Sequence, residues 1–240
     1  LIYLIIESGG KMKNMKKDFI TLAKTISLFI LLLIFKELFI LVINQFIDLS
    51  KVSKNSISYI YLIADLMYMM ILFLAYHKTL IKDFKLFIKN FGENINTSFK
   101  YWFIGLIIMM ISNYLIVSCT GAIAQNEESV RSLLTSLPLY MIFSISIYAP
   151  FTEELIFRKG FKDVIENKWL YILTSGITFG AMHVVSSVTS LSDLLYLIPY
   201  CSLGIAFGSL YYKTDNIFSS MSMHFFHNTM TLLLLLIVGQ

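Results

Sequence analysis

The stretch FITLAKTISLFILLLIFKELFILVI, residues 19–43, decides the fold because it is long and apolar enough to cross a membrane. A spanning helix needs about 20 mostly apolar residues, and Lys24, Lys36 and Glu37 are the formal charges in this stretch. Across the whole chain, charged residues make up only 14%, roughly half the share found in soluble domains. The composition therefore indicates a polytopic membrane protein and argues against a soluble enzyme.

Six further apolar segments follow the first one along the chain. The sequence therefore predicts an all-α, polytopic transmembrane helix bundle of about seven spans, with an eighth left open. Pro138 and Pro150 are expected to kink the fourth span. The opening run LIYLIIESGG is too short for a signal peptide, and Met12 or Met15 is an alternative start. The six segments cover residues 57–76, 101–122, 133–157, 169–189, 193–212 and 216–238.

The basic residues predict the orientation of these spans. With the N-terminus in the cytoplasm, fourteen lysines and arginines fall in inner segments and three, Lys51, Lys54 and Arg131, in outer segments. Such a bias is typical of cytoplasmic loops, so the basic pI does not indicate a nucleic-acid partner. Residues 77–100 alternate lysines with phenylalanines, which favours an amphipathic helix on the inner membrane surface.

The two cysteines indicate neither a disulfide framework nor a zinc module.

The segment FTEELIFR, residues 151–158, places three charges in an apolar chain. Glu154 and Arg158 are four residues apart on a helix, in the favourable order for an ion pair. Glu153 points about 100° away and has no local partner, which makes it a candidate base or metal ligand. The alternative is that all three charges form a cluster at the inner membrane interface.

Two later segments, FGAMH and HFFHN, place polar side chains on helix faces. Phe179 and His183 share one face, as do His224 and Asn228, while His227 flanks the second face. Taken singly, each segment is better explained by hydrogen bonds between helices. Gly176 and Gly180, on the same predicted helix as His183, allow a neighbouring backbone to approach closely.

Together, these three segments supply the groups of a water-activating hydrolytic site. A glutamate can take a proton from water, and histidine and asparagine can stabilise an oxyanion. If zinc is the cofactor, Glu153, His183 and His224 are suitable ligands and the ion acidifies the water. A site without a metal is the other alternative. The sequence lacks HExxH, so it does not contain the helix of a conventional zincin.

The order of these motifs resembles the CPBP family of CAAX proteases and bacteriocin-processing enzymes, also called Abi, and in particular type II CAAX prenyl endopeptidases. The family motifs EExxxR, FxxxH and HxxxN stand here as Glu153-Glu154-LIF-Arg158, Phe179-GAM-His183 and His224-FFH-Asn228. The resemblance covers about residues 140–232. It implies the following roles: Glu153 and His183 activate water, His224 and Asn228 form the oxyanion site, Glu154 and Arg158 hold the site's shape, and Phe179 lines the pocket. His227 matches no required family position.

These expectations combine into an intramembrane endopeptidase that cleaves membrane-associated or lipidated peptides. Its partners are membrane lipids and the peptide substrate. We expect a prokaryotic cell membrane, a site that opens toward the cytoplasm, and a role in bacteriocin or pheromone processing or in self-immunity. The alternatives are a non-catalytic scaffold or immunity protein and a transporter with a proton relay. The predicted regions are a basic tail (1–18), N-terminal transmembrane helices (19–130) and a catalytic core (131–240).

The predicted depths of the site residues disagree with one another. At about 1.5 Å per residue, Glu153 lies about 8 Å and His224 about 12 Å from the inner loops, whereas His183 lies about 21 Å deep. If His183 belongs to the site, residues 159–175 run partly along the interface, with the span beginning near Thr174, or the helix is strongly tilted. If neither holds, the assignment of His183 is wrong.

Overall fold

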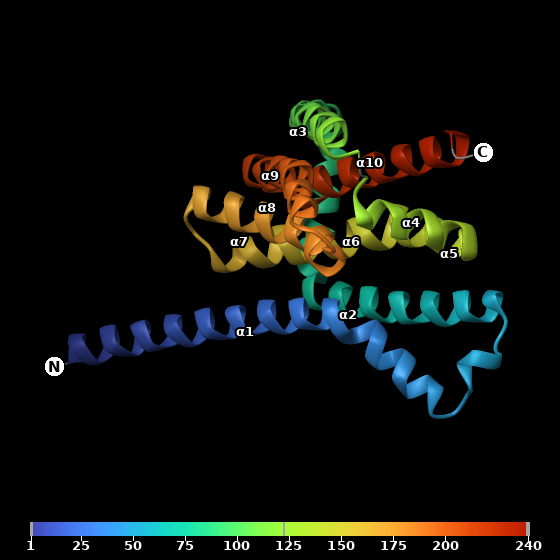
Figure 1. Cartoon of the computed structure of the whole chain (residues 1–240). Coiled ribbons are helices and arrows are strands. Elements are labelled where there is room, and N and C mark those ends of the chain that lie inside the picture. Colours follow the sequence, from blue (N-terminus) through green and yellow to red (C-terminus); the bar gives the residue numbers. More distant parts are fainter. Residues whose placement is uncertain (1, 122, 239–240) are drawn as a thin grey trace.

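A computed structural model describes residues 2–121 and 123–238, with side chains for residues 18–121 and 123–237. All regular elements in this part of the chain are helices, which confirms the all-α class. Elements η2 and η3 are π-helical, and η1, η4 and η5 are 3-10 helices. In chain order (Figure 1), the elements are α1 (Ile2–Asn44), η1 (Leu49–Lys51), α2 (Lys54–Lys89), α3 (Phe91–Thr120), α4 (Gln125–Ser136), α5 (Pro138–Phe143), η2 (Ser144–Tyr148), α6 (Ala149–Glu153), η3 (Glu154–Gly160), α7 (Phe161–Val164), α8 (Lys168–Val184), η4 (Val185–Ser187), η5 (Leu191–Tyr196), α9 (Leu197–Thr214) and α10 (Ile217–Val238).

Six helical segments of the described chain are long and apolar enough to span a membrane, which confirms a polytopic bundle. They are α1 from Asp18, α2, α3, α8 with η4, η5 with α9, and α10 up to Ile237. The remaining predicted span, 133–157, corresponds to the continuous helical run from α5 to α7, which two π-helical segments interrupt. Pro138 begins this run, and Pro150 lies between the two π-helical segments. The number of spans and the orientation of the N-terminus stay predictions.

Two N-terminal features differ from the expected layout. Residues 77–89 continue α2 and residues 91–100 begin α3, so the predicted amphipathic segment is not a separate helix. The predicted basic tail, 1–18, is helical from Ile2 and continuous with α1, while the side chains of its lysines lie outside the described part of the chain. The membrane-surface contact expected for residues 77–100 stays a prediction.

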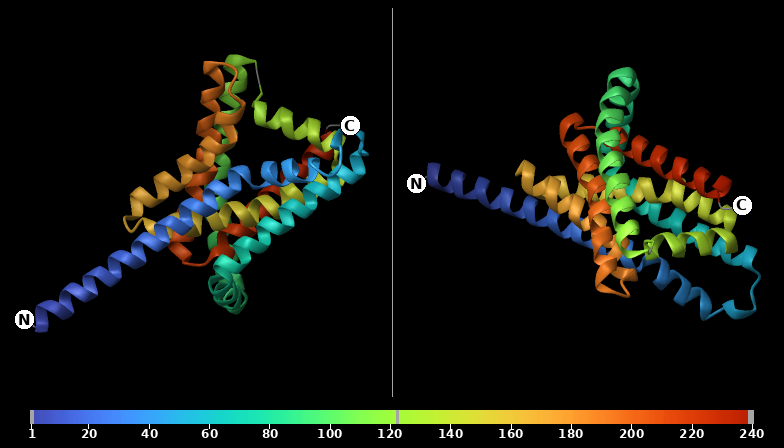
Figure 2. Two further views of the ribbon diagram at one scale, coloured as in Figure 1. Left: turned by 90° about the horizontal axis from the view of Figure 1, so that it is seen from below. Right: turned by 45° about the horizontal axis from the view of Figure 1, so that its top comes forward.

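The helices alternate in direction, so their connections gather at two ends of the bundle (Figures 1 and 2). One end, which we call the α4 end, carries the 45–53 connection, α4, the α8–α9 connection and the end of α10. The opposite end carries the α2–α3 junction at Asn90 and the turns at 165–167 and 215–216. Ala124, Val184 and Tyr196 pack into one cluster, which ties together three of the segments at the α4 end.

Helices α8 and α9 pack backbone to backbone. A Cβ atom on Gly204 would lie 2.5 Å from the carbonyl oxygen of Gly176, and one on Gly180 would lie 2.8 Å from the backbone nitrogen of Cys201. The close approach predicted from Gly176 and Gly180 is therefore confirmed. It brings the end of α8, which carries His183, against the first half of α9.

Candidate active site

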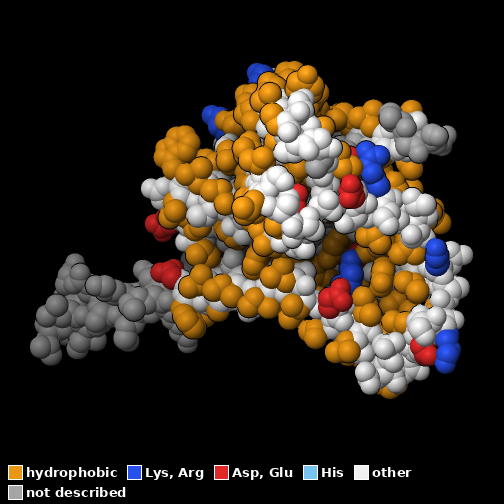
Figure 3. All heavy atoms as spheres, in the orientation of Figure 1, with side chains coloured by type: hydrophobic (Ala, Val, Ile, Leu, Met, Phe, Trp, Pro, Cys, Tyr) orange, Lys and Arg blue, Asp and Glu red, His pale blue; other side chains and the backbone are white. Residues whose placement is uncertain are grey.

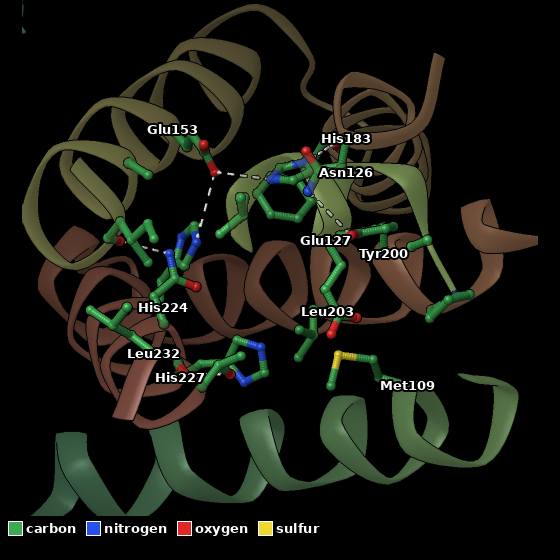
Figure 4. A pocket seen from close by; sticks show the side chains of 18 of the residues that line it. Met109, Asn126, Glu127, Glu153, His183, Tyr200, Leu203, His224, His227 and Leu232 are labelled. Atoms are coloured by element: carbon green, nitrogen blue, oxygen red, sulfur yellow. Dashed lines mark hydrogen bonds and ion pairs between the residues drawn. The ribbon is translucent and has the colours of Figure 1, made fainter. Parts of the chain in front are cut away.

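Three of the motif residues meet around one carboxylate oxygen (Figure 4). Glu153 ends α6, His183 lies in the last turn of α8, and His224 lies near the start of α10. The Oε2 atom of Glu153 is 4.0 Å from Nε2 of His183 and 3.7 Å from Nε2 of His224. These distances exceed a direct hydrogen bond, so no direct bond joins the carboxylate oxygen to either imidazole.

The imidazole of His183 is held by its own helix and by an aromatic ring. Its Nδ1 atom lies 2.9 Å from the carbonyl oxygen of Phe179, one helical turn earlier. Because a carbonyl only accepts, Nδ1 carries the proton and Nε2 keeps a lone pair. The ring of Tyr200, from α9, stacks on the imidazole with centroids 5.1 Å apart. The Nε2 lone pair therefore faces Glu153.

The imidazole of His224 is fixed by the second glutamate. Its Nδ1 atom donates to Oε1 of Glu154 at 3.0 Å, so its Nε2 atom is the nitrogen that faces Glu153. Phe207 stacks on the ring with centroids 5.1 Å apart, and Phe179 meets it edge-on. Both histidines thus use Nδ1 for orientation and turn Nε2 toward the same carboxylate.

Glu154 forms a fully buried ion pair with Arg158, and Arg158 also bonds to Ser175. We call these three residues the closed layer. The Nε atom of Arg158 donates to Oε2 of Glu154 at 3.2 Å, and both side chains are completely buried. Arg158 also donates through Nη1 to the hydroxyl oxygen of Ser175 at 2.8 Å, and that hydroxyl donates to the carbonyl of Phe157 at 2.7 Å. The predicted ion pair is confirmed.

The three charges do not form an exposed cluster, because Glu154 and Arg158 have no exposed side-chain surface. Their depth relative to the membrane interface stays a prediction. The helix continues for six residues beyond Arg158 to Val164, so Arg158, one of the fourteen basic residues counted as inner, does not belong to a loop. The aromatic rings of Phe179 and Phe207 lie 4.8 and 5.9 Å from its guanidinium carbon, and such contacts stabilise a cation removed from water.

Glu153 contrasts with its neighbour in having no hydrogen-bond partner for Oε2 among the described residues. The side chain is 17% exposed and lines a cavity of about 330 Å³. Buried polar atoms without a partner are costly and rare. Glu153 therefore presents an unsatisfied acceptor at the wall of a cavity, between two histidine Nε2 atoms.

The cavity extends from Glu153 to α3 and α4 (Figure 4). Its walls are mainly apolar, and polar groups stand at intervals along them. Most of its lining residues were not indicated by the sequence motifs. An aromatic residue at helical spacing is an ordinary core residue in an apolar chain, and α4 carries no motif at all. Among the lining residues that sequence reasoning missed are Asn126, Glu127, Tyr200 and Phe207.

Asn228 and His227 also line the cavity, but each already makes a hydrogen bond. The Nδ2 atom of Asn228 donates to the carbonyl of Ile145 at 2.9 Å, which leaves one of its two N–H groups for a ligand. The Nδ1 atom of His227 accepts from Nε1 of Trp102 at 3.4 Å. His227 therefore lines the cavity wall, where it is held by Trp102, and lies apart from Glu153 and His183 (Figure 4).

The expected disagreement in depth narrows for Glu153 and His183, because the helix containing Glu153 is longer than predicted, while His224 stays about 10 Å from the start of α10. The three side chains meet all the same. The run from α5 ends at Val164 and α8 begins at Lys168. Measured from these ends at about 1.5 Å per residue, Glu153 lies about 17 Å and His183 about 22 Å along the two helices. The earlier estimate for Glu153 placed the inner loop at Arg158, six residues too early.

The zinc alternative was tested on the donor atoms. Glutamate and two histidines are suitable ligands by chemistry, yet no group of three His, Cys, Asp or Glu side chains in the described part of the chain is placed to hold an ion. We therefore derive no catalytic step through a metal.

The fold and the site define a polytopic α-helical membrane protein with a buried Glu–His–His cluster beside an apolar cavity. Residues 135–230 match the family model described as "Type II CAAX prenyl endopeptidase Rce1-like". All three motifs lie within the matched residues. This match confirms the resemblance to the CAAX protease family that the motifs predicted.

Two curated relatives are similar to part of the chain, and one of them is named as a membrane peptidase. The chain is 28% identical over 151 residues to the "Putative membrane peptidase YdiL" of Bacillus subtilis (strain 168), covering 62% of this chain and 52% of that protein. It is 28% identical over 144 residues to the "UPF0177 protein YvdC" of Lactococcus lactis subsp. lactis (strain IL1403), covering 55% and 53%. The chain thus spans about half the length of these two relatives. No solved structure matches significantly.

Proposed function

We propose that this chain is an intramembrane endopeptidase that hydrolyses peptide bonds of membrane-associated peptides. One observation carries the proposal: the unsatisfied Oε2 of Glu153 faces the Nε2 atoms of His183 and His224 at 4.0 and 3.7 Å inside a cavity. A carboxylate and an imidazole that converge on one point are suited to activating water. The similarity to CAAX-type endopeptidases and to a membrane peptidase supports the same chemistry.

In the proposed first step, a water molecule binds between Glu153 and His183. Oε2 of Glu153 takes one proton, while the Nε2 lone pair of His183 accepts a hydrogen bond from the other. Orientation of the His183 ring by the Phe179 carbonyl keeps this lone pair available. The water oxygen then attacks the carbonyl carbon of the peptide, and the carbonyl oxygen becomes an oxyanion.

Stabilisation of that oxyanion is proposed for His224 and Asn228. Because Nδ1 of His224 already donates to Glu154, its Nε2 can donate only when the ring is an imidazolium. Asn228 contributes its remaining N–H. The C–N bond then breaks, and the protonated Glu153 returns its proton to the leaving amine.

The apolar cavity favours a substrate that reaches the site from the lipid phase. Apolar walls with a few polar groups are typical of sites that bury a largely apolar ligand. We therefore propose membrane-associated or lipidated peptides as substrates, with CAAX-type chemistry. Peptide maturation, of a bacteriocin or pheromone for example, or self-immunity is the biological role we propose for a prokaryotic cell.

The test is cleavage of a pooled quenched-fluorescent library, including lipidated CAAX peptides, by the purified protein in detergent. Glu153→Gln keeps the side-chain shape and removes the base, so we expect a loss of about 10²- to 10⁴-fold in rate. Glu128→Gln, on the exposed face of α4, is the matched control and should cleave like the wild type. Equal cleavage by wild type and Glu153→Gln would exclude Glu153 as the base, and sensitivity to a chelator would show metal dependence.

A further inference from the structure

The cavity beside Glu153 lies wholly toward the α4 end of the bundle. Its walls come from the ends of α8 and α10 nearest α4 and from the first turns of α9. Ala124, Asn126, Glu127 and Val130, in and just before α4, complete it. A second cavity, of about 280 Å³, shares Ala124 and Glu127 and continues between α3, α4 and η5. The two together form a path from the site to the α4 end.

The opposite side of the site is closed by packed side chains. The closed layer lies directly beneath Glu153, and its Arg158 and Glu154 are completely buried. Phe157, Tyr171 and Ile217 fill the space around this layer and are at most 1% exposed. Because protein interiors are packed without gaps, a peptide cannot reach Glu153 from the end that carries the 165–167 and 215–216 turns.

The two ends of the bundle differ strongly in basic residues. The face of the molecule drawn in Figure 3 is mostly hydrophobic, with few charged side chains. When Arg158, the N-terminal lysines and the two lysines inside α1, Lys24 and Lys36, are left out, nine lysines lie toward the end opposite α4 and three basic residues lie toward the α4 end. Lysine and arginine accumulate on the cytoplasmic side of membrane proteins. The three are Lys51, Lys54 and Arg131, and the nine are Lys78, Lys82, Lys85, Lys89, Lys100, Lys159, Lys162, Lys168 and Lys213.

The predicted cytoplasmic N-terminus and the predicted cytoplasmic opening of the site are therefore incompatible in this fold. A cytoplasmic N-terminus places the α4 end outside the cytoplasm, because α1, α2 and α3 each reverse the direction of the chain before α4. The lysine distribution supports a cytoplasmic N-terminus. The cavity, which lies toward the α4 end, is then on the outer side of the membrane.

We propose that the cavity opens to the non-cytoplasmic side of the membrane and that its substrate is a peptide segment presented from that side. The second half of this statement rests on the proposed endopeptidase function. The path to Glu153 leads past Asn126 and Glu127, so a chain that enters from outside meets polar groups first and apolar walls next. A membrane-anchored peptide whose cleavage site lies just within the outer leaflet has this pattern.

The orientation can be tested without any measurement of activity. In a background with Cys119→Ala and Cys201→Ala, the exposed Glu128 of α4 and the exposed Glu166 of the α7–α8 turn are replaced singly by cysteine. Spheroplasts of a bacterial host are treated with a membrane-impermeant maleimide, and the labelled fraction is divided by that obtained after detergent lysis. We expect a ratio near one for Glu128→Cys and near zero for Glu166→Cys. Any other pattern overturns the proposed orientation.

The opening itself needs a second pair of variants. Ala149 lines the cavity beside Glu153, and Ser146 lies three residues earlier, buried outside the cavity. In spheroplasts, Ala149→Cys should be labelled by the same reagent, and Ser146→Cys should stay unlabelled. An unlabelled Ala149→Cys would mean that the cavity is closed from outside. Because labelling needs no substrate, these results stand apart from success or failure of the cleavage assay.

Discussion

The closed layer and the cavity around Glu153 adjoin each other, yet the two neighbouring glutamates are bonded in opposite ways. In the closed layer, Glu154 is bonded to Arg158 and to Nδ1 of His224, and no side-chain surface of the ion pair is exposed. In the cavity, Oε2 of the next residue, Glu153, has no hydrogen-bond partner among the described residues. The two neighbouring glutamates therefore have different roles. Glu154 stabilises the helix packing, and Glu153 keeps a hydrogen-bond acceptor free for a ligand.

This difference predicts which substitutions destabilise the protein and which affect only its chemistry. Buried charges that pair with each other contribute stability as a set, so loss of one partner leaves the other charge uncompensated. This holds for Glu154 and Arg158, although Nη2 of Arg158 has no hydrogen-bond partner among the described residues. Buried polar groups without a hydrogen-bond partner reduce the stability of the fold, and functional sites commonly contain them. The following changes address the two layers and the packing that joins them, from the largest expected effect to the smallest.

Arg158→Ala should cause the largest loss of stability. It leaves Glu154 buried without its cation and removes a side chain packed between Phe179 and Phe207. We expect a loss of about 3 to 5 kcal/mol, measured as a lower melting temperature in detergent. Arg131→Ala breaks an exposed ion pair with Glu127 and should cost about 1 kcal/mol or less. Similar losses from both variants would contradict a special role for the closed layer.

Gly204→Ala tests the packing that sets His183 against α9. The added Cβ would lie 2.5 Å from the carbonyl oxygen of Gly176, so the two helices must separate. We expect a loss of about 1 to 3 kcal/mol together with slower cleavage, because His183 moves with α8. Gly92→Ala is the control, since no atom lies within 4 Å of its added Cβ. If Gly204→Ala melts like the wild type, the close helix contact is not needed.

Ser175→Ala removes one acceptor of Arg158 and the donor to the Phe157 carbonyl. Arg158 keeps the backbone carbonyl of Ser175 as an acceptor, so the expected loss is about 1 kcal/mol. Unfolding followed by tryptophan fluorescence measures it. Cleavage should stay within a few-fold of the wild type, and a complete loss of activity would show that the closed layer takes part in the chemistry directly.

Tyr200 offers the most specific change, because it addresses the orientation of His183 alone. Its ring stacks on His183, and its hydroxyl accepts a hydrogen bond from Asn126. Tyr200→Ala should slow cleavage about tenfold, since aromatic stacking contributes about 1 kcal/mol. Tyr200→Phe keeps the ring and should retain most of the activity. Equal losses in both variants would mean that the hydroxyl group orients the site.

The sequence predicted the composition of the site better than its surroundings. Charged and polar residues are rare in an apolar chain, so Glu153, His183 and His224 stood out, and the ion pair of Glu154 and Arg158 followed from helical spacing. The burial of Arg158 could not be predicted, because a basic residue near a helix end is usually interfacial. Only the tertiary fold shows that the helix continues beyond it.

The shape of the cavity was equally beyond sequence analysis. Its walls include Tyr200, Phe207 and residues of α4, which are drawn from elements distant in sequence and carry no pattern that distinguishes lining residues from core residues. The π-helical segments that flank Pro150 also have no sequence signature, although such segments are frequent at functional sites. The side on which the site opens depends on the fold and on the lysines together.

One pair of isosteric variants tests the contrast between the two layers most directly. Glu153→Gln and Glu154→Gln are measured on the same preparations, for thermal unfolding in detergent and for cleavage of the quenched-fluorescent peptides. We predict that Glu153→Gln abolishes cleavage while melting at or above the wild-type temperature, and that Glu154→Gln lowers the melting temperature clearly. An active Glu153→Gln enzyme, or one as destabilised as Glu154→Gln, would contradict the assignment of Glu153 as the base.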